Sequence, residues 1–420
     1  MSVATEVNNT SSVRPKDRLV LRDLACRVAE IAALPVMAER RATWKRHNSL
    51  ERVRPMILIF PEGSWRELIP QDTLICEDDT ARSIEFELRR RIYTHEHFSD
   101  DTVIEDQWVV NSTVIDSGWG VETRHKSSHQ DTGAWGFDPV IKTREDLQKL
   151  SLPVVHYDRI TTEMNLSIAH ELFGDILSVK PKGIGNISFH LMAVYTKLRG
   201  LQQVFMDMIE NPEMLHEAMA FLERGYRQRV EQYESLNLLS LNNDGTYHSS
   251  GGVGYSSELP LKDADPEHVR PKDIWASAES QEMDPVSPDM HKEFVMQYEK
   301  RLLAPFGLNG YGCCDNLTHK LEHVLEIPNI RRISIAPWAD VDLCADQLRG
   351  DCIFSWKPKP THLVGAFDES ALKKYIKHTL EVTSGCVTEM ILKDTHTCEN
   401  EPERFTRWSS IARDLVEKHA

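Results

Sequence analysis

Short apolar runs and longer amphipathic stretches take turns along most of this chain of 420 residues. The runs have the length of buried strands, and the stretches between them place apolar residues at helical spacing. Residues 211–236 are a clear example of a helix, because Asn211 and Pro212 are typical of a helix start. Strands that alternate with helices form a parallel sheet whose crossovers are helical. The alternation therefore predicts an α/β fold.

The clearest strand candidates are the apolar runs at residues 54–60, 333–335, 352–354 and 387–392. Before the first of them, residues 17–48 have apolar positions at helical spacing and predict one or two helices. We therefore divide the chain into a tail with a helical extension, residues 1–50, and one α/β domain, residues 51–420. Residues 245–287 are rich in Gly, Ser and Pro and predict a loop that covers the mouth of the site.

Charge and hydropathy exclude several classes of protein. The formal net charge of −16, with no concentrated basic stripe, argues against a nucleic-acid partner. No run of about 18 apolar residues occurs, so we expect no membrane span. The first 16 residues lack the apolar segment of a secretory signal. Eight cysteines are too few for a disulfide scaffold in a chain of this length, so we expect a cytoplasmic protein.

Two groups of sulfur and imidazole side chains follow apolar runs that lie far apart in the chain. The first is Gly312-Cys313-Cys314-Asp315, and the second is Asp394-Thr395-His396-Thr397-Cys398. Thiolate and imidazole are the ligands that zinc prefers, usually four in a tetrahedral arrangement. If the fold brings these strand ends together, the chain has a metal site.

The motifs of the second half follow one another in a characteristic order: Trp275–Glu279, Val286–Met290, Tyr311–Asn316, Ile333–Asp340 and Lys357–Pro360. This succession resembles the uroporphyrinogen decarboxylase superfamily, which also contains the cobalamin-dependent methyltransferases. The resemblance covers roughly residues 50–415 and is most specific from Glu279 to Arg404. It implies a TIM (β/α)8 barrel after the helical N-terminal extension, so that residues 51–420 are a catalytic barrel. The active site of such a barrel lies at the C-terminal ends of its strands.

The stretch after the first predicted strand separates the two branches of this superfamily. Decarboxylases carry an arginine-rich motif there, which grips the carboxylates of the porphyrin. This chain has Phe60-Pro61-Glu62-Gly63 instead, and the carboxylate of Glu62 would repel a polyanionic substrate. The resemblance therefore favours the methyltransferase branch.

That branch holds zinc with a His-x-Cys motif after one strand and a further cysteine near the C-terminus. The first motif aligns with Gly312-Cys313-Cys314, in which a glycine replaces the histidine, and the second aligns loosely with residues 394–398. The resemblance thus favours Cys314, His396 and Cys398 as the zinc ligands, with Glu279 as a possible fourth. The alternative is that these thiols only pack in the core, where free cysteines are common.

Three other polar residues are candidates for substrate contact or proton transfer. Asp244 follows a plausible strand at residues 238–241, and it either contacts the substrate, as the resemblance implies, or begins an Asx-turn. His248 is either a general acid or base or a hydrogen-bonded loop residue. Glu279 is either a ligand or base or simply exposed to solvent.

The resemblance implies a zinc-dependent methyltransferase that moves a methyl group between a corrinoid protein and a small-molecule donor or a thiol or folate acceptor. Zinc would either lower the pKa of a bound thiol or polarise an oxygen of the donor. The corrinoid (cobalamin) has to come from a partner protein, because the chain has no Asp-x-His-x-x-Gly motif. Two alternatives stay open: a lyase for a non-porphyrin substrate that uses Asp244 and His248, and a non-catalytic barrel that binds a corrinoid protein.

Overall fold

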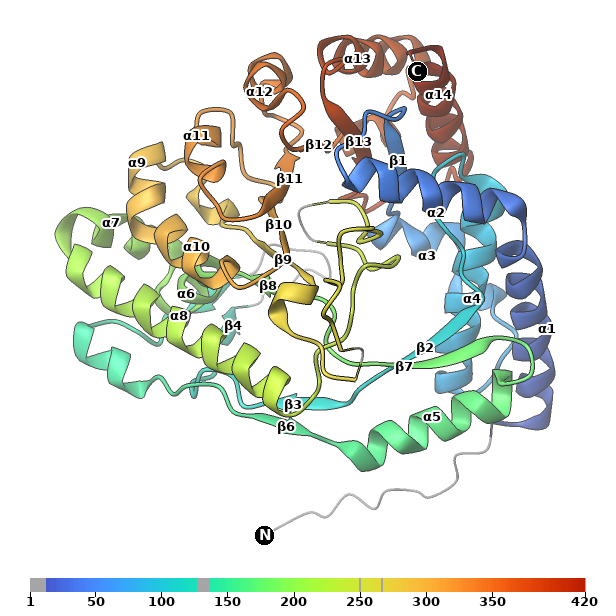
Figure 1. Ribbon diagram of the computed structural model, residues 1–420, viewed down its shortest axis with the longest axis horizontal. Coiled ribbons are helices and arrows are strands. Elements are labelled where there is room, and N and C mark those ends of the chain that lie inside the picture. Colours follow the sequence, from blue (N-terminus) through green and yellow to red (C-terminus); the bar gives the residue numbers. More distant parts are fainter. Residues whose placement is uncertain (1–12, 127–135, 249–250, 266, 420) are drawn as a thin grey trace.

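The computed structural model describes residues 13–126, 136–248, 251–265 and 267–419 (Figure 1). Its central feature is a sheet of seven parallel strands in the order β1-β13-β12-β11-β10-β9-β8. These strands are β1 (Met56–Ile59), β8 (Ser188–Phe189), β9 (Trp275–Ala278), β10 (Leu308–Tyr311), β11 (Ile330–Ile335), β12 (Ile353–Trp356) and β13 (Val387–Leu392). Every residue of β1, β9, β10, β12 and β13 is buried, as expected for parallel strands that are covered on both faces.

Helices connect the successive strands and surround them on the outside (Figure 1). They are α6 (Leu191–Arg199), α7 (Leu201–Glu210), α8 (Pro212–Ser235), α9 (Pro288–His291), α10 (Gln297–Leu303), α11 (Leu321–Val324), α12 (Val341–Leu348), α13 (Glu369–Val382) and α14 (Glu403–His419). The predicted strands at the four apolar runs and the predicted helix that begins at Pro212 are confirmed. The chain therefore has the α/β architecture with a parallel sheet and helical crossovers.

The hydrogen-bonded ladder of the described strands has two ends, β1 and β8. Beside β8, the predicted strand at residues 238–241 is reduced to one parallel bridge between Leu239 and Ile184. The side chain of Asn242 extends this contact, because its Nδ2 donates to the carbonyls of Gly185 at 2.7 Å and Trp275 at 2.9 Å. Closure into an eight-stranded TIM barrel stays a prediction.

Two helices form the predicted N-terminal extension, α1 (Pro15–Ala32) and α2 (Pro35–Asn48). Helix α1 packs on α4 (Asp79–His97) and on α5 (Arg159–Phe173), while the end of α2 is buried against the sheet. The side chain of Asn48 donates to the carbonyls of Val253 at 2.8 Å and Tyr255 at 2.6 Å. Apolar contacts join the same elements, so the extension shares a core with the sheet.

The loop predicted at residues 245–287 was expected to cover the mouth of the site, but this range contains strand β9. The described part of the loop instead packs into the interior, where Val253 and Tyr255 join a buried cluster with Leu58 of β1 and Ile391 of β13. The physical reason is the apolar content of this part of the loop, which gains more from burial than from exposure at a rim.

Within the described residues, six further strands pair outside the central sheet. They form the parallel pair β2 (Gln107–Asn111) with β7 (Ser178–Lys182) and the antiparallel pairs β3 (Val114–Asp116) with β6 (Val155–Tyr157) and β4 (Arg124–Lys126) with β5 (Gly136–Asp138). Among the described helices, none has the length and apolar content that would let it cross a membrane.

Candidate functional site

The carboxyl ends of the parallel strands place several reactive side chains at one edge of the sheet. We call this group the strand-end cluster; it consists of His190 after β8, Glu279 after β9, Cys313 and Cys314 after β10, and Lys393 and Asp394 after β13. Parallel strands end at the same edge, which is why residues 80 positions apart, such as Cys314 and Asp394, lie in contact. The cluster joins thiols, carboxylates, an ammonium and an imidazole.

A vicinal pair of thiols lies at the centre of this cluster. The Sγ atoms of Cys313 and Cys314 are 3.7 Å apart, and Asp315 holds the turn by accepting a hydrogen bond from the backbone N–H of Cys313 at 3.0 Å. Gly312 has a φ of +84°, and a Cβ there would lie 2.7 Å from Leu317 Cδ1. This explains the glycine in place of the histidine that the resemblance implied, because a side chain at this position would be strained and would clash.

Hydrogen bonding makes one of the two thiols more acidic than an ordinary cysteine. The pKa of Cys314 is lowered because the Cys313 thiol donates to its sulfur, and for the same reason the pKa of Cys313 is raised. Lys393 donates to Cys313 Sγ at 3.5 Å, while the Cys314 thiol donates to the carboxylate of Asp394 at 3.7 Å, which opposes the shift by raising the pKa of Cys314. The net shift is still downward, so Cys314 is the thiol of the pair that ionises first.

This order of ionisation has a measurable consequence for alkylation. The rate of reaction of Cys314 with iodoacetamide is expected to rise with a pH midpoint below about 8.5, the ordinary value for cysteine. The reason is that a lowered pKa gives more thiolate at each pH below the midpoint. Mass spectrometry of the peptide gives the rate, and the exposed Cys26 is the comparison within the same chain. A midpoint for Cys314 at or above that of Cys26 would contradict the assignment.

An ion pair between imidazole and carboxylate borders the thiols. His190 Nδ1 lies 2.9 Å from Glu279 Oε1, and Cys313 neighbours the same carboxylate. Burial is the largest single effect and by itself lowers the pKa of His190 and raises that of Glu279, but their hydrogen bond and the neighbouring charges together reverse both shifts. The side chain of Glu279 is only 13% exposed, so it is not a solvent-facing carboxylate. His190 was not among the predicted site residues. The strand before it has only two residues, Ser188 and Phe189, so no apolar run in the sequence marks its position.

The predicted zinc ligands do not fit a metal site in this arrangement. Cys398 is buried, its Sγ lies 3.1 Å from Glu67 Oε2, and burial raises its pKa to about 12. Cys314 contacts Cys313 and Asp394, whereas His396 lies against Gly63. Within the part of the chain that the structure describes, no group of three or more His, Cys, Asp or Glu side chains is placed to hold a metal ion. Zinc needs its donors gathered around one point, and the Cys398 thiol is instead hydrogen-bonded to Glu67.

Asp244 and His248 lie outside the strand-end cluster. Asp244 forms the expected Asx-turn by accepting from Thr246 N at 2.8 Å, and its carboxylate is paired with Lys182 at 2.7 Å. His248 is buried, and burial lowers its pKa to about 3. Neither of its ring nitrogens has a hydrogen-bond partner among the described residues, so the structure does not support the hydrogen-bonded alternative for this side chain.

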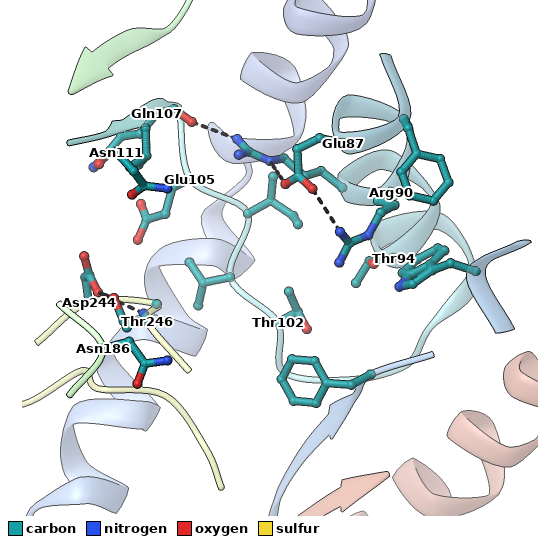
Figure 2. A pocket seen from close by; sticks show the side chains of 18 of the residues that line it. Glu87, Arg90, Thr94, Thr102, Glu105, Gln107, Asn111, Asn186, Asp244 and Thr246 are labelled. Carbon is teal, nitrogen blue, oxygen red and sulfur yellow. Dashed lines mark hydrogen bonds and ion pairs between the residues drawn. The ribbon is translucent and has the colours of Figure 1, made fainter. Parts of the chain in front are cut away.

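A cavity of about 1030 Å³ opens beside β1, and we call it the side pocket (Figure 2). Its walls come from the end of β1, from α4, from β2 and from the turns at residues 182–186 and 244–246. Glu62 lines this pocket and interacts electrostatically with Lys393 and Asp394, so the pocket borders the strand-end cluster. Asp244 is the predicted site residue that contributes to this wall.

The sequence matches no known protein-family model. It also matches no curated protein. Among solved structures, a methyltransferase from Methanosarcina mazei is similar, with a TM-score of 0.47 and 13% sequence identity over 91% of this chain and 99% of that chain. A likeness this distant says nothing about activity.

Proposed function

We propose that this protein is a methyltransferase whose reacting group is the thiolate of Cys314. The observation that carries the proposal is the vicinal thiol pair at the carboxyl edge of the parallel sheet, where the hydrogen bond from Cys313 lowers the pKa of Cys314. A thiolate is the nucleophilic form of cysteine, and it attacks a methyl carbon directly. The order of motifs in the second half of the chain supports the same class of reaction.

The step is a displacement at carbon. A bond forms between Cys314 Sγ and the methyl carbon while the bond from this carbon to the donor atom breaks, and the electron pair of that bond leaves with the donor atom. When this atom is oxygen or nitrogen, the His190 imidazolium is the acid that protonates it, because Glu279 holds the proton on His190. Lys393 offsets the negative charge of the thiol pair before the attack.

The proposal includes a corrinoid on a partner protein as one methyl carrier and a small molecule as the other. In the second step a nucleophilic atom of the acceptor would form a bond to the methyl carbon, the bond from this carbon to Cys314 Sγ would break, and its electron pair would return to the sulfur as the thiolate. The reacting thiol lies at the carboxyl ends of the strands and is partly exposed, which suits a carrier that approaches from outside. Zinc has no part in this scheme, because the side chains predicted as its ligands are not gathered around one point. A lyase that depends on His248 is not favoured, since that imidazole is buried and its pKa is lowered to about 3.

Free methylcobalamin and methyl iodide are two donors that need no partner protein and test the proposal. We expect Cys314→Ser to lower the rate of demethylation of these donors at least about 100-fold, because a serine hydroxyl is not ionised at neutral pH. Mass spectrometry of the protein with its natural sequence should find the added methyl group on Cys314. Cys26→Ser is the matched control, since Cys26 is an exposed thiol far from the strand ends in sequence. A Cys314→Ser protein that keeps the rate of the Cys26→Ser control would refute the proposal.

A further inference from the structure

We propose that the side pocket binds an organic anion, a carboxylate or a phosphate ester with an apolar body, whose charged group is held by Arg90. This site is independent of the thiol chemistry proposed above. Its volume of about 1030 Å³ is at the upper end of the range for small-molecule sites, about 300–1000 Å³. Apolar side chains from β1, α3 (Trp65–Leu68), α4 and the adjacent chain segments form much of the wall: Ile59, Phe60, Trp65, Phe86, Val103, Ile104, Val109 and Ile184.

Arg90 is the charged group of this wall that has hydrogen-bonding capacity left. Its guanidinium lies over the ring of Trp65, 5.1 Å from the centroid, and near Phe86 at 5.9 Å. Nη1 donates to Glu87 at 3.1 Å, while the buried Nε has no acceptor among the described residues. Because Nε is buried, a bound anion would contact the terminal nitrogens of the guanidinium, where a charge-assisted hydrogen bond can form. The side chain is 40% exposed, so a ligand can reach the guanidinium.

The charges around Arg90 also favour an anion. Glu87 accepts from both Arg90 and Arg91, at 3.1 and 3.0 Å, so two guanidinium groups share one carboxylate. One positive charge on this wall is therefore unmatched. The Arg91 Nη1 is used by the carbonyl of Gln107 at 2.7 Å, which leaves Arg90 as the group that faces a ligand.

Apart from Glu62, the other charged residues of the lining are already engaged. Glu105 accepts from Arg41 at 2.7 Å and from the Tyr255 hydroxyl at 2.6 Å. The Asp244 carboxylate is paired with Lys182, and Arg66 donates to the carbonyl of His396 at 3.2 Å. Glu62 is exposed beside the strand-end cluster, where burial of part of its side chain raises its pKa.

Figure 2 shows how the polar groups are divided across the pocket. Arg90 and Thr94 of α4 lie on one side, and Glu105, Asp244 and Asn186 lie on the opposite side. The ligand would place its anionic group beside Arg90 and the hydroxyl of Thr94. Its body would then extend along the apolar wall towards the amide of Asn186. This division orients the ligand, because the reverse placement would bring its anion to two carboxylates.

Probes that share one ring and differ in charge test this inference. Benzoate and phenyl phosphate are the anions, benzyl alcohol is neutral and benzylamine is cationic; binding is followed by saturation-transfer NMR and titration. We expect both the selectivity for the anions and the loss in Arg90→Gln to be at least about tenfold in affinity, since a hydrogen bond to a charged group is worth about 1.5–3 kcal/mol. The tighter of the two anions identifies the carboxylate or the phosphate as the favoured group.

Arg66→Gln is the matched control. It removes another arginine of the same lining, one whose guanidinium already donates to the backbone carbonyl of His396. It should leave the affinity for the anions unchanged. Arg90→Lys keeps the charge and should retain part of the affinity, which separates lost binding from lost folding. The inference is overturned if neither anion shows saturable binding, if the alcohol or the amine binds as well as the anions, or if Arg90→Gln binds like Arg66→Gln.

Discussion

Replacing Glu389 by glutamine is expected to lower the free energy of unfolding by about 3–5 kcal/mol, the cost of leaving a buried charge without its partner. Glu389 and Arg332 are both fully buried on β13 and β11, and Arg332 Nε lies 3.0 Å from Glu389 Oε1. His47 of α2 approaches the same carboxylate, with its Nε2 3.2 Å from Oε2. The glutamine would leave the guanidinium of Arg332 in the core with no negative charge beside it.

Chemical denaturation at neutral pH measures this loss, and Glu381→Gln is the control. Glu381 is an exposed partner of Lys377 at 3.5 Å, and removing such a surface pair should cost about 1 kcal/mol or less. The double variant Arg332→Met with Glu389→Leu should lose less stability than Glu389→Gln alone, because it removes both charges together. Equal losses of unfolding free energy in Glu389→Gln and Glu381→Gln would show that the buried pair stabilises the fold no more than a surface pair does.

The same pair predicts how stability depends on pH. Burial is the largest single effect and raises the pKa of Glu389, but the charges of Arg332, His47 and Lys357 and the hydrogen bond from His47 together lower the pKa from 4.5 to about 2. A carboxyl with a depressed pKa stabilises the fold at pH values above its ordinary pKa and loses this contribution as the pH falls through its folded pKa. The stability difference between the natural chain and Glu389→Gln should therefore shrink between about pH 4.5 and pH 2.

The parallel sheet could be predicted because several of its strands are continuous apolar runs in the sequence. The run at 387–392 is apolar except for Thr388 and Glu389, and all of its residues are buried. Glu389 was itself a signal that the sequence analysis did not use. A carboxylate inside a buried strand needs a partner, and Arg332 in the run at 330–335 is a cation in the same setting.

The candidate site could be predicted only in part, because its geometry depends on loop paths that have no periodic pattern. Cys313, Cys314 and Glu279 follow recognisable strands, and they do lie together. His396 and Cys398 follow β13, but between the strand and these residues the chain turns through a positive φ at Asp394. Together with the hydrogen bonds from Cys398 to Glu67, this turn carries the second thiol to another partner. The spacing of His396 and Cys398 in the sequence does not predict that turn.

Replacing Trp44 by alanine is also expected to cost about 3–5 kcal/mol of unfolding free energy, the usual loss for a buried tryptophan. Trp44 of α2 is fully buried in a cluster with Met56 and Leu58 of β1 and Ile391 of β13. Its Nε1 donates to the carbonyl of Asp101 at 2.9 Å. The substitution would therefore remove both apolar contacts and a buried hydrogen bond at the join between the N-terminal extension and the sheet.

Trp338→Ala is the control, because this tryptophan is 56% exposed and its loss should change stability by about 0.5 kcal/mol or less. Thermal unfolding followed by circular dichroism compares the two variants. If α2 belongs to the core of the sheet, the Trp44→Ala protein should unfold in one transition at a lower temperature. A chain that lacks residues 1–50 and still unfolds cooperatively at the temperature of the full chain would show that the extension is separable. Such a result would contradict the structural role that we assign to Trp44 and to the neighbouring side chains His47 and Asn48.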